Sequence, residues 1–197
     1  MAGESDEVLN KPEYWDQHYS NTEGDLPTHE WYRTSEDLAN FFQENLFDAE
    51  GITAQDDPLI LHLGSGDSVR GLVPAHTRVG AWLMFFFAKQ AIPAEFASKG
   101  YRRQLCVNFS ATVVSMMTER YKNIEGIEWR HADVRSMDTV LDKSIKVAFN
   151  KGTLDTMIHG SPWSPTAAVR ENSSKYLHEV RRFPDRLHHR VLLTAGA

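Results

Sequence analysis

The sequence is poor in the residues that mark secreted, metal-binding or membrane proteins. A single cysteine, Cys106, among 197 residues excludes an internal disulfide framework and a cysteine-rich zinc site. The longest apolar run, 81–88, is far shorter than the roughly 20 residues that a membrane-spanning helix needs. The first seven residues are too polar for a secretory signal. We therefore expect a cytoplasmic protein with one globular domain and no membrane partner.

Positive charge is scarce in the first part of the chain. Residues 1–57 contain 15 acidic and two basic side chains, whereas residues 58–197 contain 12 acidic and 19 basic ones. The basic part has no lysine or arginine cluster longer than two, so it lacks the concentrated basic face that nucleic-acid binding requires. The acidic part is interpreted as a solvated segment, and the alternative is a surface that attracts a basic partner.

The spacing of apolar residues predicts strands that alternate with helices. One helix is expected over 35–47, and one over 166–182 with Val169, Tyr176, Leu177 and Val180 together. Ser110 is expected to cap a further helix with Val113, Val114, Met117 and Tyr121 on one face. The expected strands are 59–63, 104–109, 127–131 and 145–149. This alternation predicts an α/β fold with a doubly wound, mainly parallel sheet and helices on both faces.

Each predicted strand ends in residues that suit a nucleoside-type cofactor, and ligands of such sheets bind at the carboxyl ends of the strands. Glycines let the backbone approach a ligand closely, polar side chains can bond ribose, and an Asp beside a backbone amide can bond the adenine edge. In chain order the four ends are Gly64-Ser65-Gly66, Asn108-Phe109, Asp133-Val134 and Asn150-Lys151-Gly152.

Several other kinds of site are not indicated. Val69 stands where a dinucleotide-binding loop would be expected to place its third glycine, and no Tyr-x-x-x-Lys pair offers dehydrogenase chemistry, which argues against a nicotinamide enzyme. The adjacent His188 and His189 lack metal-ligand spacing, so we expect no metal. Cys106 lies within a predicted strand, where a buried thiol is expected rather than a nucleophile.

Six motifs occur in the order found in a known family. The chain resembles the class I S-adenosylmethionine-dependent methyltransferases, in particular the methyltransferase-like branch whose members methylate lysines of translation elongation factor. The resemblance covers about 11–68 and 92–180. Its motifs are Tyr14-Trp-Asp-Gln-His-Tyr19, Glu30-Trp31-Tyr32, Leu61-His-Leu-Gly-Ser-Gly-Asp-Ser68, Cys106-Val-Asn-Phe-Ser110, Ala132-Asp-Val-Arg135 and Asn150-Lys-Gly-Thr-Leu-Asp155.

The resemblance implies that aromatic side chains before the sheet close over S-adenosyl-L-methionine. Trp15, Tyr19 and Trp31 would take this role, because aromatic faces attract a sulfonium cation. From composition alone, these aromatics are also compatible with a place in the core. The acidic segment 1–34 would carry this aromatic cover, and 35–197 would form the methyltransferase domain.

The resemblance also assigns cofactor contacts to the strand ends. Gly64 would let its loop approach the methionine portion, and Lys151 would lie beside that portion. The nucleoside would be held by Asn108, Phe109, Asp133 and Val134. Methyl transfer from a sulfonium to a neutral amine depends mainly on proximity and alignment, so we assign no catalytic residue.

The chain departs from the family pattern at four places. Asn108 and Asn150 stand where the family usually has acids, and an amide in place of a carboxylate is expected to weaken cofactor binding about tenfold at Asn108. Residues 69–90 form an insertion beside the predicted cofactor site. Because valine codons begin with GT and glutamine can be encoded by CAG, this segment is interpreted as a translated, retained intron, and the alternative is a tolerated surface insertion.

The last departure is the tail 181–197, which does not resemble the family's final strands, so those strands are expected to be missing. Two functions follow from the sequence. The first is a methyltransferase acting on a protein lysine, with an elongation factor as a candidate partner. The second is an inactive, truncated or mis-spliced relative that binds the cofactor weakly or not at all.

Overall fold

The computed structural model describes residues 7–20, 37–67, 92–141, 143–161, 163–183 and 190–194. Predicted features outside these ranges are Trp31, the whole of segment 69–90, and the start of the helix expected over 35–47. No helix in the described ranges is both long enough and apolar enough to cross a lipid bilayer.

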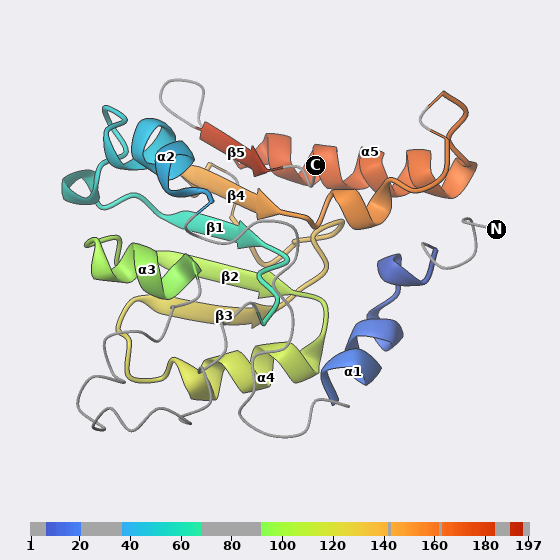
Figure 1. The fold of residues 1–197 in the computed structure, drawn as a ribbon, viewed down its shortest axis with the longest axis horizontal. Coiled ribbons are helices and arrows are strands. Elements are labelled where there is room, and N and C mark those ends of the chain that lie inside the picture. The colour runs from blue at the N-terminus through green and yellow to red at the C-terminus, as the bar shows by residue number, and fades with distance from the viewer. Residues whose placement is uncertain are drawn as a thin grey trace.

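Five parallel strands form one sheet in the order β3-β2-β1-β4-β5 (Figure 1). Strand β1 lies at its centre, and both of its faces are buried, as expected of a parallel sheet covered on two sides. The strands are β1 Ile60–Leu63, β2 Gln104–Asn108, β3 Ile127–His131, β4 Val147–Lys151 and β5 Arg190–Thr194. The predicted α/β fold with a mainly parallel sheet is confirmed.

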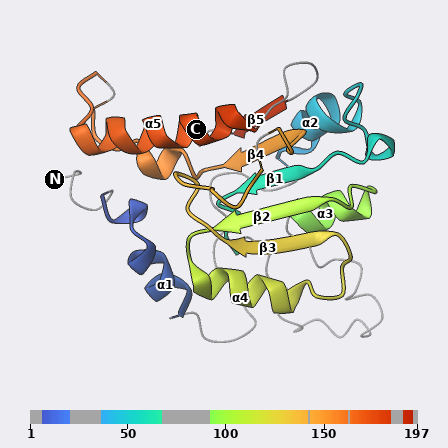
Figure 2. The ribbon, with the colours of Figure 1, turned by 180° about the vertical axis from the view of Figure 1, so that it is seen from behind.

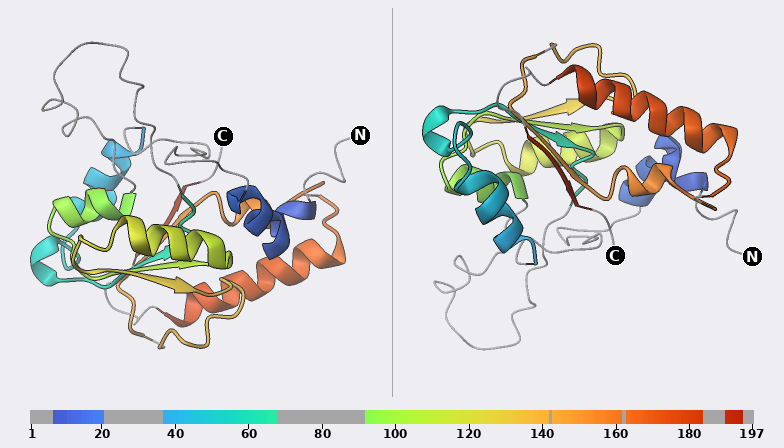
Figure 3. Two further views of the ribbon diagram at one scale, coloured as in Figure 1. Left: turned by 90° about the horizontal axis from the view of Figure 1, so that it is seen from below. Right: turned by 90° about the horizontal axis from the view of Figure 1, so that it is seen from above.

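Helices cover both faces of this sheet. Helices α2, α3 and α4 lie on one face and α5 lies on the other (Figure 3). The helices are α1 Pro12–Ser20, α2 Ala39–Phe42, α3 Ile92–Ser98, α4 Ala111–Arg120 and α5 Ala167–Arg182. A π-helical segment, η2 Gln43–Phe47, continues α2, and short 3-10 turns are η1 Glu7–Asn10, η3 Ala54–Asp56 and η5 Asp155–Met157.

Alternate residues of β1 supply two separate parts of the core. Ile60 packs on the α2 and α3 side with Phe42 and Phe96, whereas Leu61 and Leu63 pack on the α5 side. This division follows from the two-residue period of a strand, which sends neighbouring side chains to opposite faces. Burial of large apolar side chains on both faces fixes the register of β1, because a slip of one residue would exchange the two sets.

Most predicted elements agree with the structure within two residues. Strand β4 begins at Val147, two residues later than expected, because its pairing with β1 begins opposite Ile60. On α5, Val169, Tyr176 and Val180 are buried, but Leu177 is 47% exposed. Leu177 therefore does not share the buried face on which the spacing grouped it with the other three, since one residue is a turn of about 100° along a helix.

The predicted loss of the final strands was wrong for the strand next to β4. Arg190–Thr194 pairs in parallel with Val147–Lys151 and extends the sheet to β5 (Figure 2). The short apolar run 191–193 follows α5 closely, which is the arrangement of a strand-helix-strand unit returning to its sheet. The tail 181–197 thus contributes the end of α5 and one strand.

Candidate functional site

A cavity opens at the carboxyl ends of the strands, and its lining contains every predicted site residue that the structure describes. The empty space in it is about 1010 Å³, counting the part open to solvent. The predicted residues that line it are Trp15, Tyr19, Gly64, Asn108, Phe109, Asp133, Val134 and Lys151. Residues from five separate segments thus meet at one place, although their part in cofactor binding stays a prediction.

The loop after β1 approaches the cavity with its backbone. Gly64 and Gly66 both have positive φ angles, of 66° and 50°, which side chains of L-residues rarely allow. A Cβ atom added to Gly64 would lie 2.1 Å from Oγ1 of Thr153, so this position has no room for a side chain. The Thr153 hydroxyl donates a hydrogen bond to the Leu63 carbonyl at 2.8 Å and ties the loops after β1 and β4 together.

Asn108 ends β2 and is buried at the cavity wall. Its Oδ1 accepts a hydrogen bond from the Ser110 backbone amide at 2.8 Å, which shapes the turn into α4. The Ser110 hydroxyl in turn accepts from the Val113 amide and caps that helix, as predicted. The Asn108 amide oxygen therefore already has one local partner at the place where the family resemblance expects a ribose contact.

Asp133 follows β3 and forms a forked ion pair with Arg135. The Arg135 Nη2 lies 2.6 Å from Asp133 Oδ2, and the Arg135 backbone amide donates to Oδ1 at 2.8 Å. Arg135 also donates to Asn172 of α5 at 3.1 Å. Burial acts to raise the pKa of Asp133, but the hydrogen bonds and charge of Arg135 outweigh it and leave the pKa below its usual value. The site thus holds a charged carboxylate in a fixed orientation.

Helix α1 brings two aromatic rings to the cavity from before the sheet. Trp15 and Tyr19 are buried, and their rings stack with centroids 5.7 Å apart. The Trp15 indole donates to the Leu9 carbonyl at 2.7 Å, and Asp16 Oδ1 accepts from the Ser110 hydroxyl at 2.6 Å. Burial and the nearby Asp67 raise the pKa of Tyr19, so its hydroxyl stays protonated.

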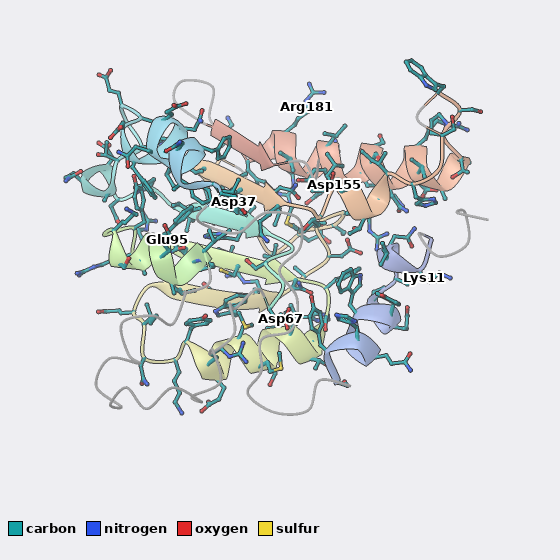
Figure 4. All side chains as sticks on the ribbon, viewed as in Figure 1. Lys11, Asp37, Asp67, Glu95, Asp155 and Arg181 are labelled. Carbon is teal, nitrogen blue, oxygen red and sulfur yellow. The ribbon has the colours of Figure 1, made fainter. Side chains whose placement is uncertain are left out.

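The end of β4 places Lys151 at the cavity beside a tight turn. Asn150 is buried, and its Oδ1 accepts from the Leu154 backbone amide at 3.2 Å. Gly152 has a positive φ of 80°, which lets the chain turn toward η5. Asp155, the first residue of η5, lies beside α5 (Figure 4). The second amide that departs from the family pattern therefore stabilises this turn.

The floor of the cavity includes a neutral histidine. His62 of β1 is fully buried, its Nε2 lies 2.8 Å from Gln104 Oε1, and desolvation lowers its pKa to about 4 despite that hydrogen bond. Cys106 is buried in β2, and desolvation raises the pKa of its thiol, which makes it a poor nucleophile.

Several residues that line the cavity were not predicted from the sequence, although they lie within the motifs described above. Arg135 and Thr153 belong to the same motifs as Asp133 and Lys151, and their position within four residues of a strand end is a usable signal. His62 alternates with Leu61 and Leu63 in β1, so its side of the sheet was predictable but its nearness to the cavity was not. Within the described ranges, no group of three or more histidine, cysteine or acidic residues forms a metal site.

The chain was compared with known protein families, curated proteins and solved structures. No family model matches the chain. The chain is 29% identical over 172 residues to EEF1A lysine methyltransferase 4 of Mus musculus, and the match covers 86% of this chain and 55% of that protein. The chain therefore spans about half the length of this curated relative.

Solved structures show the same fold at low sequence identity. Phosphoethanolamine N-methyltransferase 1 of Haemonchus contortus superposes with a TM-score of 0.53 at 13% identity, covering 93% of this chain and 31% of that one. Geranyl diphosphate C-methyltransferase of Streptomyces coelicolor A3(2) gives 0.51 at 13% identity, covering 88% of this chain and 60% of that one. This chain has the class I S-adenosylmethionine-dependent methyltransferase fold. The fold that the resemblance implied is thereby confirmed.

Proposed function

We propose that this protein is an S-adenosyl-L-methionine-dependent methyltransferase that acts on a lysine of a protein substrate. One observation carries the proposal: the ends of four strands and the aromatic face of α1 converge on a single cavity. The solved structures with this fold that are named above hold S-adenosylhomocysteine. The proposal assigns that cavity to the cofactor.

The residues present fit such a group. Trp15 and Tyr19 offer aromatic faces that attract a sulfonium cation, and the Gly64 loop offers backbone that no side chain covers. Asp133 is held charged by Arg135 at the nucleoside end, and Lys151 lies at the opposite wall. When bound, S-adenosyl-L-methionine supplies an activated methyl group. The contribution of this chain is to bind, orient and exclude water, which in favourable cases contributes roughly 7–11 kcal/mol.

The proposed acceptor is a lysine of translation elongation factor 1A, as the name of the mouse relative indicates for that protein. A protein lysine suits this site because its amine, once neutral, needs orientation more than a catalytic base. The proposal includes the cytoplasmic location predicted from the sequence, since a single free, buried cysteine suits a reducing compartment.

Cofactor binding is tested by titration calorimetry with S-adenosylhomocysteine on the full chain. Saturable heat that competes with S-adenosyl-L-methionine supports the proposal, and the absence of heat at millimolar ligand overturns it. Methyl transfer is then measured with radiolabelled cofactor and purified elongation factor 1A. Label in a lysine of the factor supports the acceptor, whereas cofactor binding without transfer overturns that part alone.

The second candidate is a non-catalytic chain with weak cofactor affinity. Asn108 and Asn150 favour it, because each uses its amide oxygen in a local turn and neither supplies a carboxylate. Residues 69–90 also favour it, since they follow the Gly64 loop in the sequence. Deletion of 69–90 tests this point: if the insertion is the main fault, affinity for S-adenosylhomocysteine rises after the deletion. The genomic codons test the intron hypothesis, which requires GT at the start and AG at the end.

A further inference from the structure

Residues 7–20 form a strap over one side of the cavity, with a contact at each end. At one end η1 lies against η5, and Asn10 lines the cavity. At the other end α1 lies against α4 (Figure 1). Trp15 and Tyr19 lie in the second half of the strap, and both line the cavity. The position of the two rings therefore depends on what holds α1 to α4.

Asp16 supplies a polar contact between these helices. Its Oδ1 accepts a hydrogen bond from the Ser110 hydroxyl at 2.6 Å, a length typical of a hydroxyl bound to a carboxylate. The same oxygen lies 3.5 Å from the Thr112 backbone nitrogen in the first turn of α4. A negative charge at the start of a helix is also favoured by the helix dipole.

We propose that Asp16 is a positioning residue that fastens the strap, and thereby holds Trp15 and Tyr19 in place for cofactor binding. The inference rests on the proposed function. Ser110 joins the two parts, because it caps α4, donates its backbone amide to Asn108 Oδ1 and donates its hydroxyl to Asp16. The strap is thus tied to the same turn that shapes the wall of the cavity at the end of β2.

The expected effect follows from the population of the fastened state. The apparent affinity of a ligand that binds only one state is its intrinsic affinity multiplied by the fraction of protein in that state. Loss of a hydrogen bond to a charged group in a partly buried site changes such an equilibrium by roughly tenfold or more. Fastening therefore affects cofactor affinity and release even though Asp16 itself does not line the cavity.

The test compares Asp16→Ala and Asp16→Asn with Glu13→Gln as a matched control. Glu13 is exposed and lies one turn earlier on the same helix, so its replacement changes the charge but not the contact with Ser110. The dissociation constant for S-adenosylhomocysteine is expected to rise about tenfold in Asp16→Ala, chiefly through faster release. Asp16→Asn keeps an acceptor oxygen and should show a smaller rise, and Glu13→Gln should match the wild type.

Hydrogen exchange without cofactor separates this inference from the proposed function. Amides of 12–20 should exchange faster in Asp16→Ala than in the wild type, while those of β1 and β2 keep their protection. Faster exchange in α1 with unchanged affinity would overturn the positioning role, and unchanged exchange would overturn the fastening itself. If the wild type binds no S-adenosylhomocysteine, the proposed function fails, and the exchange result still decides whether Asp16 holds the strap.

A double-mutant cycle with Ser110→Ala checks that the two side chains act through each other. Because Ser110→Ala removes the donor, adding Asp16→Ala should raise the dissociation constant little further. Fully additive effects would show that Asp16 acts by another route and would overturn the proposal. Thermal unfolding of each variant confirms that binding is compared between folded proteins.

Discussion

The two halves of the cavity are built by different means. In the half after β1 and β4, backbone surrounds the space: Gly64 and Gly152 have positive φ angles, and Thr153 locks the two loops together. In the half after β2 and β3, side chains form the wall, held by the hydrogen bond between Asn108 and Ser110 and by the ion pair between Asp133 and Arg135. Gly64 in the first half should therefore have no room for an added Cβ, whereas the second half should respond to changes of charge and hydrogen bonding.

The largest effect is expected from Gly64→Ala. The new Cβ would lie 2.1 Å from Thr153 Oγ1 at a φ of +66°, so overpacking and backbone strain add to about 4 kcal/mol of lost stability. Urea unfolding measures this loss. Gly160→Ala is the control, because Gly160 has a φ of +76° with nothing within 4 Å of a new Cβ, and it should lose only the strain. Equal losses in both variants would show that Thr153 does not limit the space at Gly64.

Acid should destabilise the protein through His62, which lies in β1. His62 resists protonation in the native state, where its pKa is about 4, whereas the unfolded chain binds a proton near pH 6.5. The free energy of unfolding should therefore fall as the pH drops from about 6.5 to about 4, by about 3 kcal/mol. Urea unfolding across this range tests the effect. His62→Gln does not titrate and should flatten the curve in this window, and an unchanged slope would assign the loss to another group.

A carboxylate at the end of β2 should raise the affinity of the protein for S-adenosylhomocysteine. Asn108→Asp keeps an oxygen for the Ser110 amide and adds a carboxylate toward the proposed ribose position. We expect the dissociation constant for S-adenosylhomocysteine to fall about tenfold. Asn150→Asp serves as the comparison, since its side chain bonds the Leu154 amide in the other half. A weaker complex in Asn108→Asp would show that the amide is the better partner for this cavity.

The smallest effect is expected from Asp133→Asn, which removes the charge of the fork. The pKa of Asp133 is lower in the native state than in the unfolded chain. The ion pair with Arg135 therefore stabilises the native state at pH values above the usual aspartate pKa, and this stabilisation is lost as the pH falls through the native pKa. The variant should lose about 1 kcal/mol near pH 7, since the carboxylate is 32% exposed. Unfolding of both proteins at pH 7 and pH 3 measures this, and the difference should shrink at the lower pH.

The sequence was informative wherever a local pattern decides the structure. The cap at Ser110 and the strands around Leu61, Cys106 and Trp129 follow from spacing and chain direction, so they were predictable. The spacing groups Leu177 with Val169, Tyr176 and Val180, yet Leu177 is exposed, because periodicity defines an apolar stripe but not its edge. The tail 181–197 does not resemble the family's ending and so predicts no strand, yet its own apolar run 191–193 lies within the strand at 190–194.

The amino-acid sequence by itself determined the alternation of elements, their parallel direction, and hence that the four strand ends meet at one edge. It did so because these properties follow from the period of apolar residues and from the handedness of the connections. The tertiary structure alone decided which polar groups pair there: Asp16 with Ser110, Thr153 with Leu63, and Arg135 with both Asp133 and Asn172. Most of these partners lie tens of residues apart, and their pairing depends on distances and burial that only the packed sheet and helices create.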